Sequence, residues 1–333
     1  MLIPREYLET VLQGNTPSRV PVLPLLGFSS AWIYKVDFQK ASSDGELMAK
    51  LQVRLAEALD LDGLFTFMDL TVEPEALGAK ILWRDIPAVE KPLPISEVDT
   101  IKDKLNDYPY MGRLPEFIKA VKRMKELAGD KRFVCGYVGG GLSLGAELFG
   151  VEETLRNVRR NPSLVKKIID ESNKFSLKLG KVLAEEGADC VMILEPVGAL
   201  ISIKSFKELL LDSLKELVAT IKKSGAHAFL HICGNANHVI ELMEESGAEA
   251  LSIDKFVKIS NAKQRTSKPA IMGNIGTAET YTYKPEKLAA LVEETIKDAG
   301  PERFILSTGC EVPPYTPYEN LETLVKTAKK IIF

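Results

Sequence analysis

Histidine and cysteine are scarce in this sequence. Its 333 residues include only three histidines and four cysteines, and four cysteines in so long a chain do not make a disulfide framework. A chain of this length buries a large core without disulfides or metal ions as cross-links. Free thiols fit a reducing compartment, where they are available for metal binding or catalysis. We therefore expect a cytoplasmic protein.

The sequence also lacks long apolar runs and an excess of either charge. No stretch of about 18 uninterrupted apolar residues occurs, and the first ten residues have no apolar segment typical of a signal peptide. The 43 basic and 46 acidic residues give a net charge of −3, whereas proteins that bind nucleic acids usually carry a basic excess. We therefore expect neither a membrane nor a nucleic acid as a partner.

Short apolar runs alternate with longer amphipathic segments along the chain. Each run is apolar on both faces and bounded by Gly, Asp or Pro, which is typical of buried parallel strands. The eight runs are 20–26, 64–70, 133–138, 190–194, 229–233, 250–254, 270–275 and 304–307. Strands that alternate with helices indicate a parallel sheet, and eight of them predict a (β/α)8 TIM barrel formed as a single domain by residues 1–333. A doubly wound open sheet is the alternative.

Residues 71–112 are the least regular part of the chain and follow the second predicted strand. They include five prolines, Pro74, Pro87, Pro92, Pro94 and Pro109. We expect an insertion here, in the form of a small hairpin or cap. A long irregular loop in a compact domain is often functional, but a surface insertion without a role fits the sequence equally well.

Polar side chains that bind metals or transfer protons lie at the ends of the predicted strands. They are Asp69, Glu195, His231, Cys233, Asp254, Asn274 and Cys310. The carboxyl ends of barrel strands meet at one mouth, where barrel enzymes place their chemistry. Asp69, Glu195 and Asp254 are therefore candidate catalytic residues, able to hold a substrate or move a proton. Asn274 is a candidate for binding a cofactor or substrate, and a helix cap is its alternative role.

His231 and Cys233 are the sharpest local signal. They are two residues apart in a predicted strand, so their side chains point to the same face. Imidazole nitrogen and thiolate sulfur are ligands that Zn²⁺ favours, and Cys310 is a third donor. Three protein ligands with one open position are typical of catalytic zinc, and Glu195 is a candidate fourth ligand or hydrogen-bond acceptor. Taken alone, the pair fits a buried cysteine and a core histidine as well.

Several segments together resemble the uroporphyrinogen decarboxylase superfamily, and more narrowly its zinc-dependent, corrinoid-linked methyltransferase branch. That branch includes the methylcobamide:coenzyme M methyltransferases and the first methyltransferases of corrinoid-dependent O-demethylases. The segments are 230–235 (LHICGN), 251–254 (LSID), 273–275 (GNI) and 306–313 (LSTGCEVP), with 19–21 (RVP) and 187–189 (GAD) also similar. The resemblance implies a (β/α)8 barrel with zinc held at its mouth by His231, Cys233 and Cys310.

The resemblance further implies methyl transfer between a small molecule and the cobalt of a corrinoid. The sequence has no Asp-x-His-x-x-Gly corrinoid motif, so the corrinoid (cobalamin) is expected on a separate protein. The small molecule is either a thiol acceptor such as coenzyme M or a methyl ether donor, and the sequence leaves this choice open.

Two other functions are compatible with parts of the sequence. A tetrapyrrole decarboxylase of the uroporphyrinogen type is the first alternative. Resemblance to that decarboxylase branch implies an arginine-rich segment after the first strand, which would bind the carboxylates of the substrate. Residues 21–34 of this sequence contain no arginine. A non-catalytic module that binds a corrinoid protein is the second alternative, and the ionisable groups at the predicted mouth argue against it.

Overall fold

A curled parallel sheet is the frame of the protein. The computed structural model describes residues 2–84 and 86–333. Seven strands in this part of the chain form one sheet in the order β1-β4-β5-β6-β7-β8-β9, and every neighbouring pair is parallel. Their bounds are β1 Gly63–Phe65, β4 Phe133–Gly139, β5 Cys190–Leu194, β6 His227–Ile232, β7 Ala250–Ile253, β8 Ala270–Ile275 and β9 Phe304–Thr308.

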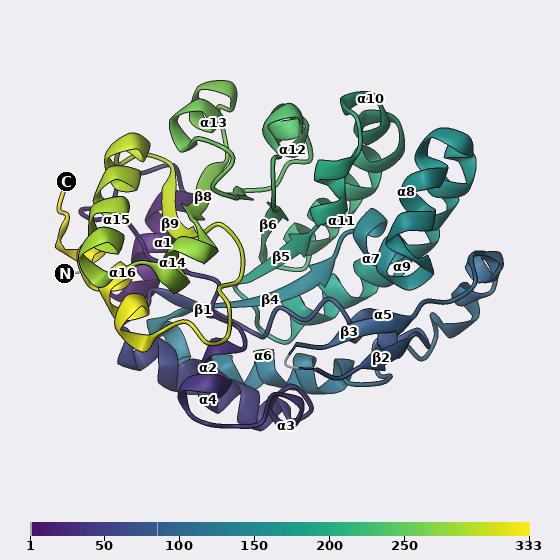
Figure 1. Ribbon diagram of the computed structural model, residues 1–333, viewed down its shortest axis with the longest axis horizontal. Coiled ribbons are helices and arrows are strands. Elements are labelled where there is room, and N and C mark those ends of the chain that lie inside the picture. The colour runs from purple at the N-terminus through teal and green to yellow at the C-terminus, as the bar shows by residue number, and fades with distance from the viewer. Residues whose placement is uncertain (1, 85) are drawn as a thin grey trace.

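Most helices lie around the outside of this sheet (Figure 1). The helices that precede β4 are α1 Pro4–Leu12, α2 Ser29–Ile33, α3 Phe38–Ser42, α4 Gly45–Ala58, α5 Val72–Ala76 and α6 Leu114–Ala128. Next along the chain come α7 Gly141–Phe149, α8 Val151–Arg160, α9 Pro162–Glu185, α10 Ile203–Ser205 and α11 Leu211–Lys223. The last are α12 Ile240–Glu245, α13 Ile259–Arg265, α14 Thr277–Thr282, α15 Pro285–Ala299 and α16 Tyr318–Lys330.

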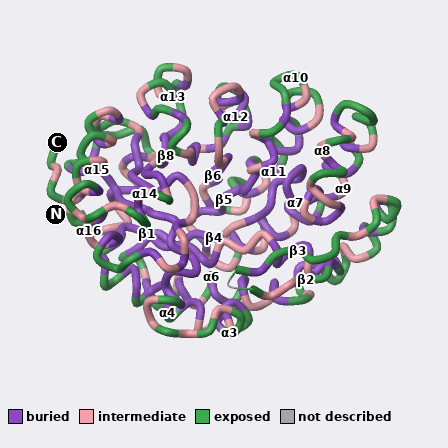
Figure 2. Tube along the Cα trace, viewed as in Figure 1, coloured by how far each residue is buried: buried purple, intermediate pink, exposed green. Residues whose placement is uncertain are grey.

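The strands are apolar on both faces because both faces are covered. In β5, Cys190 and Met192 face an interior cluster, while Val191 and Ile193 pack into the larger cluster that the helices share. Helix α1 contributes Leu8 to the interior cluster. Burial is concentrated along the strands and the helix surfaces that meet them, and exposed residues lie at the periphery (Figure 2). This double burial explains the runs without polar alternation.

The segment 20–26 does not form the predicted first strand. Val22 makes an isolated bridge to Leu306 of β9, and the backbone N–H of Asp62, just before β1, donates to the carbonyl of Val22 at 3.2 Å. The segment thus lies between the two edge strands with only isolated pairing. Pro21 and Pro24 lack the N–H groups that a regular ladder needs. The predicted eight-stranded barrel is therefore not confirmed, and the described sheet has seven strands.

The excursion at 71–112 contains α5 and a small antiparallel hairpin. Strand β2 (Lys80–Leu82) pairs with β3 (Ala88–Lys91), and two 3₁₀ turns follow at Ile95–Asp99 and Ile101–Lys104. The hairpin is joined to α7 beyond β3, where the N–H of Leu93 donates to the carbonyl of Leu148 at 2.8 Å.

Among the described residues, no helix is long and apolar enough to cross a membrane.

A buried ion pair joins the segment 20–26 to β1. The carboxylate of Asp62 is fully buried and accepts hydrogen bonds from Arg19 at 2.7 and 2.8 Å and from the N–H of Val22 at 2.7 Å. The Arg19 guanidinium also stacks on the ring of Tyr7, 3.6 Å from its centroid. The pair is fully hydrogen-bonded, so its desolvation is compensated.

We predict that Asp62→Ala lowers the free energy of unfolding by about 3 kcal/mol, because it leaves a buried guanidinium without its partner. Urea denaturation followed by circular dichroism measures the change. The control is Asp170→Ala, which removes an exposed ion pair with Lys166 and is expected to cost less than about 1 kcal/mol. Equal effects of the two substitutions would contradict the role given to Asp62.

Candidate metal centre and the cavity beside it

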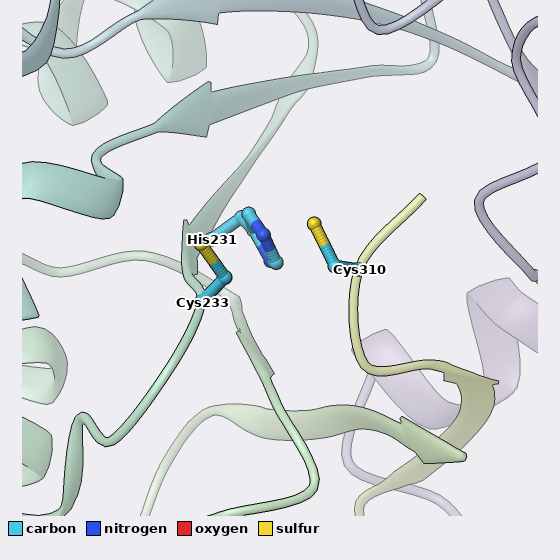
Figure 3. A group of neighbouring side chains, drawn as sticks. All are labelled: His231, Cys233 and Cys310. Carbon is cyan, nitrogen blue, oxygen red and sulfur yellow. The ribbon is translucent and has the colours of Figure 1, made fainter. Parts of the chain in front are cut away.

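Three potential metal ligands meet where β6 and β9 end. His231 lies on β6, Cys233 follows that strand, and Cys310 follows β9. Their ligand atoms all lie within 4.8 Å of one another. Figure 3 shows the imidazole and the two thiols approaching one another from these two parts of the chain. The sequence places His231 and Cys233 together, and the curl of the sheet brings Cys310 to them.

One ring nitrogen of His231 has a partner and the other does not. Nδ1 lies 3.0 Å from the hydroxyl of Ser252, which is its register partner on β7. Nε2 is buried, and no residue that the structure describes forms a hydrogen bond with it. A buried polar atom without a partner is costly, and one aimed at two thiols is placed as a metal ligand. The Ser252 contact fixes the ring orientation, as partners of metal-bound histidines do.

Of the two thiols, Cys233 loses its proton readily and Cys310 keeps its proton. The hydrogen bond from Cys310, helped by His231, lowers the pKa of Cys233 to about 5. The same hydrogen bond and burial raise the pKa of Cys310. One thiolate is therefore favourable, while a second one needs a compensating positive charge. A divalent cation bound by both sulfurs supplies that charge, so the donor set fits Zn²⁺.

Asp254 and Asn274 hold the loops around the three ligands. Asp254 accepts a hydrogen bond at 2.9 Å from the N–H of Gly234, which directly follows Cys233. The amide of Asn274 donates to the carbonyl of Val257 at 2.6 Å. Both side chains thus lie at this end of the sheet, and both form hydrogen bonds with backbone groups.

Glu195 is fully buried beside β6. Its backbone N–H donates to the carbonyl of His231 at 2.9 Å, and its carboxyl accepts hydrogen bonds from the N–H of Leu142 at 3.2 Å and from the hydroxyl of Ser143. Burial raises the pKa of Glu195 to about 7. It lies outside the three-ligand group.

Asp69 lies farther round the same end of the sheet. Its carboxylate accepts hydrogen bonds from Arg113 at 2.6 Å and from the hydroxyl of Thr71 at 2.6 Å. Arg113 also binds Glu75 at 2.6 Å and stacks over the ring of Trp83. This network fixes the start of the excursion against the sheet.

A cavity of about 920 Å³ reaches the segment that follows Cys310. Glu311, the residue after Cys310, lines it and accepts a hydrogen bond at 2.8 Å from the N–H of Phe28. Burial raises the pKa of Glu311 to about 8. The excursion and the segment after Glu311 supply much of the remaining wall, which also includes Asp69 and Glu147. The cavity gives a small molecule a place next to Glu311, the neighbour of Cys310.

A sequence profile of the family described as uroporphyrinogen decarboxylase (URO-D) matches residues 4–331. The chain belongs to the uroporphyrinogen decarboxylase family. The resemblance inferred from the sequence motifs is thereby confirmed at the level of the family.

Curated relatives within this family carry two kinds of name. A methylcobamide:CoM methyltransferase, MtbA, from Methanosarcina mazei is 29% identical, over 98% of this chain and 97% of its own length. A methylcobamide:CoM methyltransferase, MtaA, from Methanosarcina barkeri is 27% identical, over 96% and 95%. A uroporphyrinogen decarboxylase from Trichodesmium erythraeum is 23% identical, over 88% and 85%.

Solved structures support the same fold. A methyltransferase from Methanosarcina mazei superposes with a TM-score of 0.89 at 24% identity, covering 99% of each chain. A B12-independent methionine synthase from Shewanella superposes with a TM-score of 0.63 at 12% identity, covering 94% of this chain and 98% of the other. The URO-D fold of the chain is thus shared along its length.

Some residues of the site were not predicted from the sequence. Ser252 was detectable, because it precedes Asp254 by two residues and so faces the same side of its strand. Glu311 was detectable only as the neighbour of Cys310. Glu73 and Glu147 carry no strand-end signal, since they lie in α5 and α7.

Glu73 makes the stability of the fold depend on pH. Its carboxyl is buried and accepts hydrogen bonds from the hydroxyl of Tyr108 at 2.9 Å and from the N–H of Gly139 at 2.6 Å. Burial raises the pKa of Glu73 to about 7, against about 4.3 in an unfolded chain. The folded state therefore holds a proton that the unfolded state has released, so this contribution is present at low pH and is lost as pH rises through 7.

We predict that Glu73→Gln is more stable than the unchanged protein at pH 8, by about 2 kcal/mol, because glutamine does not ionise. Its oxygen is expected to accept from the N–H of Gly139, while its amide donates to the hydroxyl of Tyr108. Urea denaturation at pH 5 and pH 8 measures the difference. At pH 5 the two proteins are expected to be about equally stable. A glutamine variant that loses the same stability between pH 5 and pH 8 would contradict the assignment.

Proposed function

We propose that this chain is a zinc-dependent methyltransferase that moves a methyl group between a small molecule and the corrinoid of a separate protein. The observation that carries the proposal is the group of His231, Cys233 and Cys310 with the unpartnered, buried Nε2 of His231. The names of the methylcobamide:CoM methyltransferases, similar over nearly the whole chain, support the same reaction.

Three protein ligands leave one position of a tetrahedral zinc ion open, which is the arrangement of catalytic sites. Bound there, zinc would lower the pKa of a thiol acceptor or act as a Lewis acid on the oxygen of a methyl ether donor. Ser252 would keep the imidazole of His231 turned toward the metal.

The candidate catalytic carboxylates are assigned separate roles. Glu195 is proposed to take up or release the proton of the small molecule, since its pKa of about 7 suits that exchange. Asp69 lines the cavity and is proposed to position the small molecule. Asp254 and Asn274 keep the loops around the ligands in place. Asn274 is also proposed to contact the bound cofactor.

The corrinoid is proposed to arrive on a partner protein. This sequence has no Asp-x-His-x-x-Gly motif, so the cobalt must approach from outside, over the end of the sheet where the ligands lie. We infer that both proteins meet in the cytoplasm, with the small-molecule methyl donor or acceptor bound beforehand.

Tetrapyrrole decarboxylation is less well supported than methyl transfer. The relatives named uroporphyrinogen decarboxylase are less similar to this chain than the methyltransferases cited above. Residues 21–34 also contain no arginine for the carboxylates of such a substrate.

We further infer that the whole chain is one barrel domain. The segment 20–26 lies between β9 and β1, where an eighth strand would stand. Its isolated pairing is proposed to complete the ring around the interior cluster, with the excursion at 71–112 as an insertion at the mouth.

We predict that the purified protein holds about one zinc ion per chain, and that His231→Ala with Cys310→Ser abolishes it. Metal analysis measures the stoichiometry, and the spectrum of methylcobalamin follows methyl transfer with thiols or aryl methyl ethers. We expect the rate to fall at least a hundredfold, about 2.7 kcal/mol. The control is Cys190→Ser, a buried thiol outside the centre. Retention of zinc by the double variant would sink the proposal.

We predict that Ser252→Ala weakens zinc binding by about tenfold to a hundredfold without removing the ion, because His231 loses the partner that orients it. Competition with a fluorescent chelator measures the affinity. Ser172→Ala is the matched control, since that hydroxyl is also buried but lies in α9 and has no hydrogen-bond partner in the described part of the chain. Unchanged affinity in Ser252→Ala would show that the contact does not serve the metal.

A further inference from the structure

An unpaired carboxylate lines the cavity beside the metal centre. Glu147 lies in the last turn of α7 and is half-buried in the cavity wall. It forms neither a hydrogen bond nor an ion pair with any residue that the structure describes. Burial raises the pKa of Glu147. A carboxylate in this position is costly to ionise, and a positively charged ligand would remove that cost.

The other charged groups of the cavity do not favour an anion. Asp69 is paired with Arg113, and Glu311 is bound to the N–H of Phe28. Of the described lining residues, the one cation is Arg84, which is exposed between β2 and β3. The buried Arg113 behind Asp69 is already shared by Asp69 and Glu75, so a sulfonate or carboxylate in the cavity meets no free buried cation among the described lining residues.

The remaining wall suits an organic cation or an uncharged molecule. The rings of Phe28 and Tyr315 line the cavity, together with apolar side chains such as Met68 and Val312. Aromatic faces attract cations. The carbonyl end of α7 adds partial negative charge beside Glu147. Carboxylate, aromatic rings and helix end thus act in the same direction.

We propose that Glu147 makes this cavity selective for a positively charged or neutral small molecule and against an anion. The inference rests on the proposed function, because it takes the cavity as the place of the methyl donor or acceptor. The acceptor named for the relatives is CoM, 2-mercaptoethanesulfonate, which is an anion. This chain is therefore assigned a different class of small molecule from those relatives.

Three thiols of equal length test the charge preference. They are 2-mercaptoethylamine, 2-mercaptoethanol and 2-mercaptoethanesulfonate, which end in an ammonium, a hydroxyl and a sulfonate group. Calorimetry with the zinc-loaded full chain measures their Kd values near pH 7 at low salt. We expect the ammonium thiol to bind at least about tenfold more tightly than the sulfonate thiol. Equal or tighter binding of the sulfonate, or no binding of any thiol, overturns the proposal.

Substitution of Glu147 separates its charge from the acidity of the thiols themselves. Glu147→Gln is expected to reduce the ammonium-to-sulfonate preference to less than about threefold, and Glu147→Lys to reverse it. The matched control is Glu152→Gln, the same change on the exposed first turn of α8, which is expected to keep the preference. An unchanged preference in Glu147→Gln shows that another group sets it and overturns the role of Glu147.

The same thiols distinguish failure of this inference from failure of the proposed function. Methyl transfer from methylcobalamin with sulfonate preferred leaves the function standing and removes the inference. The expected order of Kd values without methyl transfer to any of the three thiols supports the charge selectivity and counts against thiol methylation. Binding therefore tests Glu147 independently of turnover.

Discussion

The metal centre depends on how the two edges of the curled sheet are held near each other. Cys310 follows β9, the last strand of the sheet, while His231 lies on β6, and two strands separate them. Asp62 binds Arg19 and the backbone of Val22, and Val22 bridges to β9. One buried carboxylate thus ties the region before β1 to the segment beside β9. The curl that this connection maintains is what brings a sulfur from the end of the chain to the imidazole.

The predictable part of this fold is the part set by local pattern. Runs such as 190–194 and 304–307 are buried on both faces, and apolar residues without alternation identify such strands in the sequence. The segment 20–26 has the same apolar composition, yet its two prolines prevent a regular ladder. Composition indicates that this segment is buried, whereas hydrogen-bonding capacity decides whether it is a strand.

The site residues also differ in whether the local sequence pattern predicts them. His231 and Cys233 were predictable because a strand repeats every two residues, and Cys310 because it follows another strand end. Glu147 reaches the cavity through the packing of α7, and nothing in its local sequence indicates this contact. Asp254 and Asn274 show that a polar residue at a strand end also serves the loops, since both hold backbone near the ligands.

The charge balance of the centre follows from burial. Two thiolates carry two negative charges, and a neutral imidazole carries none. A divalent cation bound by all three ligands therefore makes the centre neutral. The nearby buried carboxyls carry less than their full negative charge at neutral pH, because burial raises the pKa of Glu195 to about 7 and that of Glu311 to about 8. Asp69 is offset by Arg113. Among the described carboxyls that line the cavity, Glu147 differs in having neither a hydrogen bond nor an ion pair. A cationic small molecule in the cavity would stabilise its ionised form, and an anionic one would oppose it.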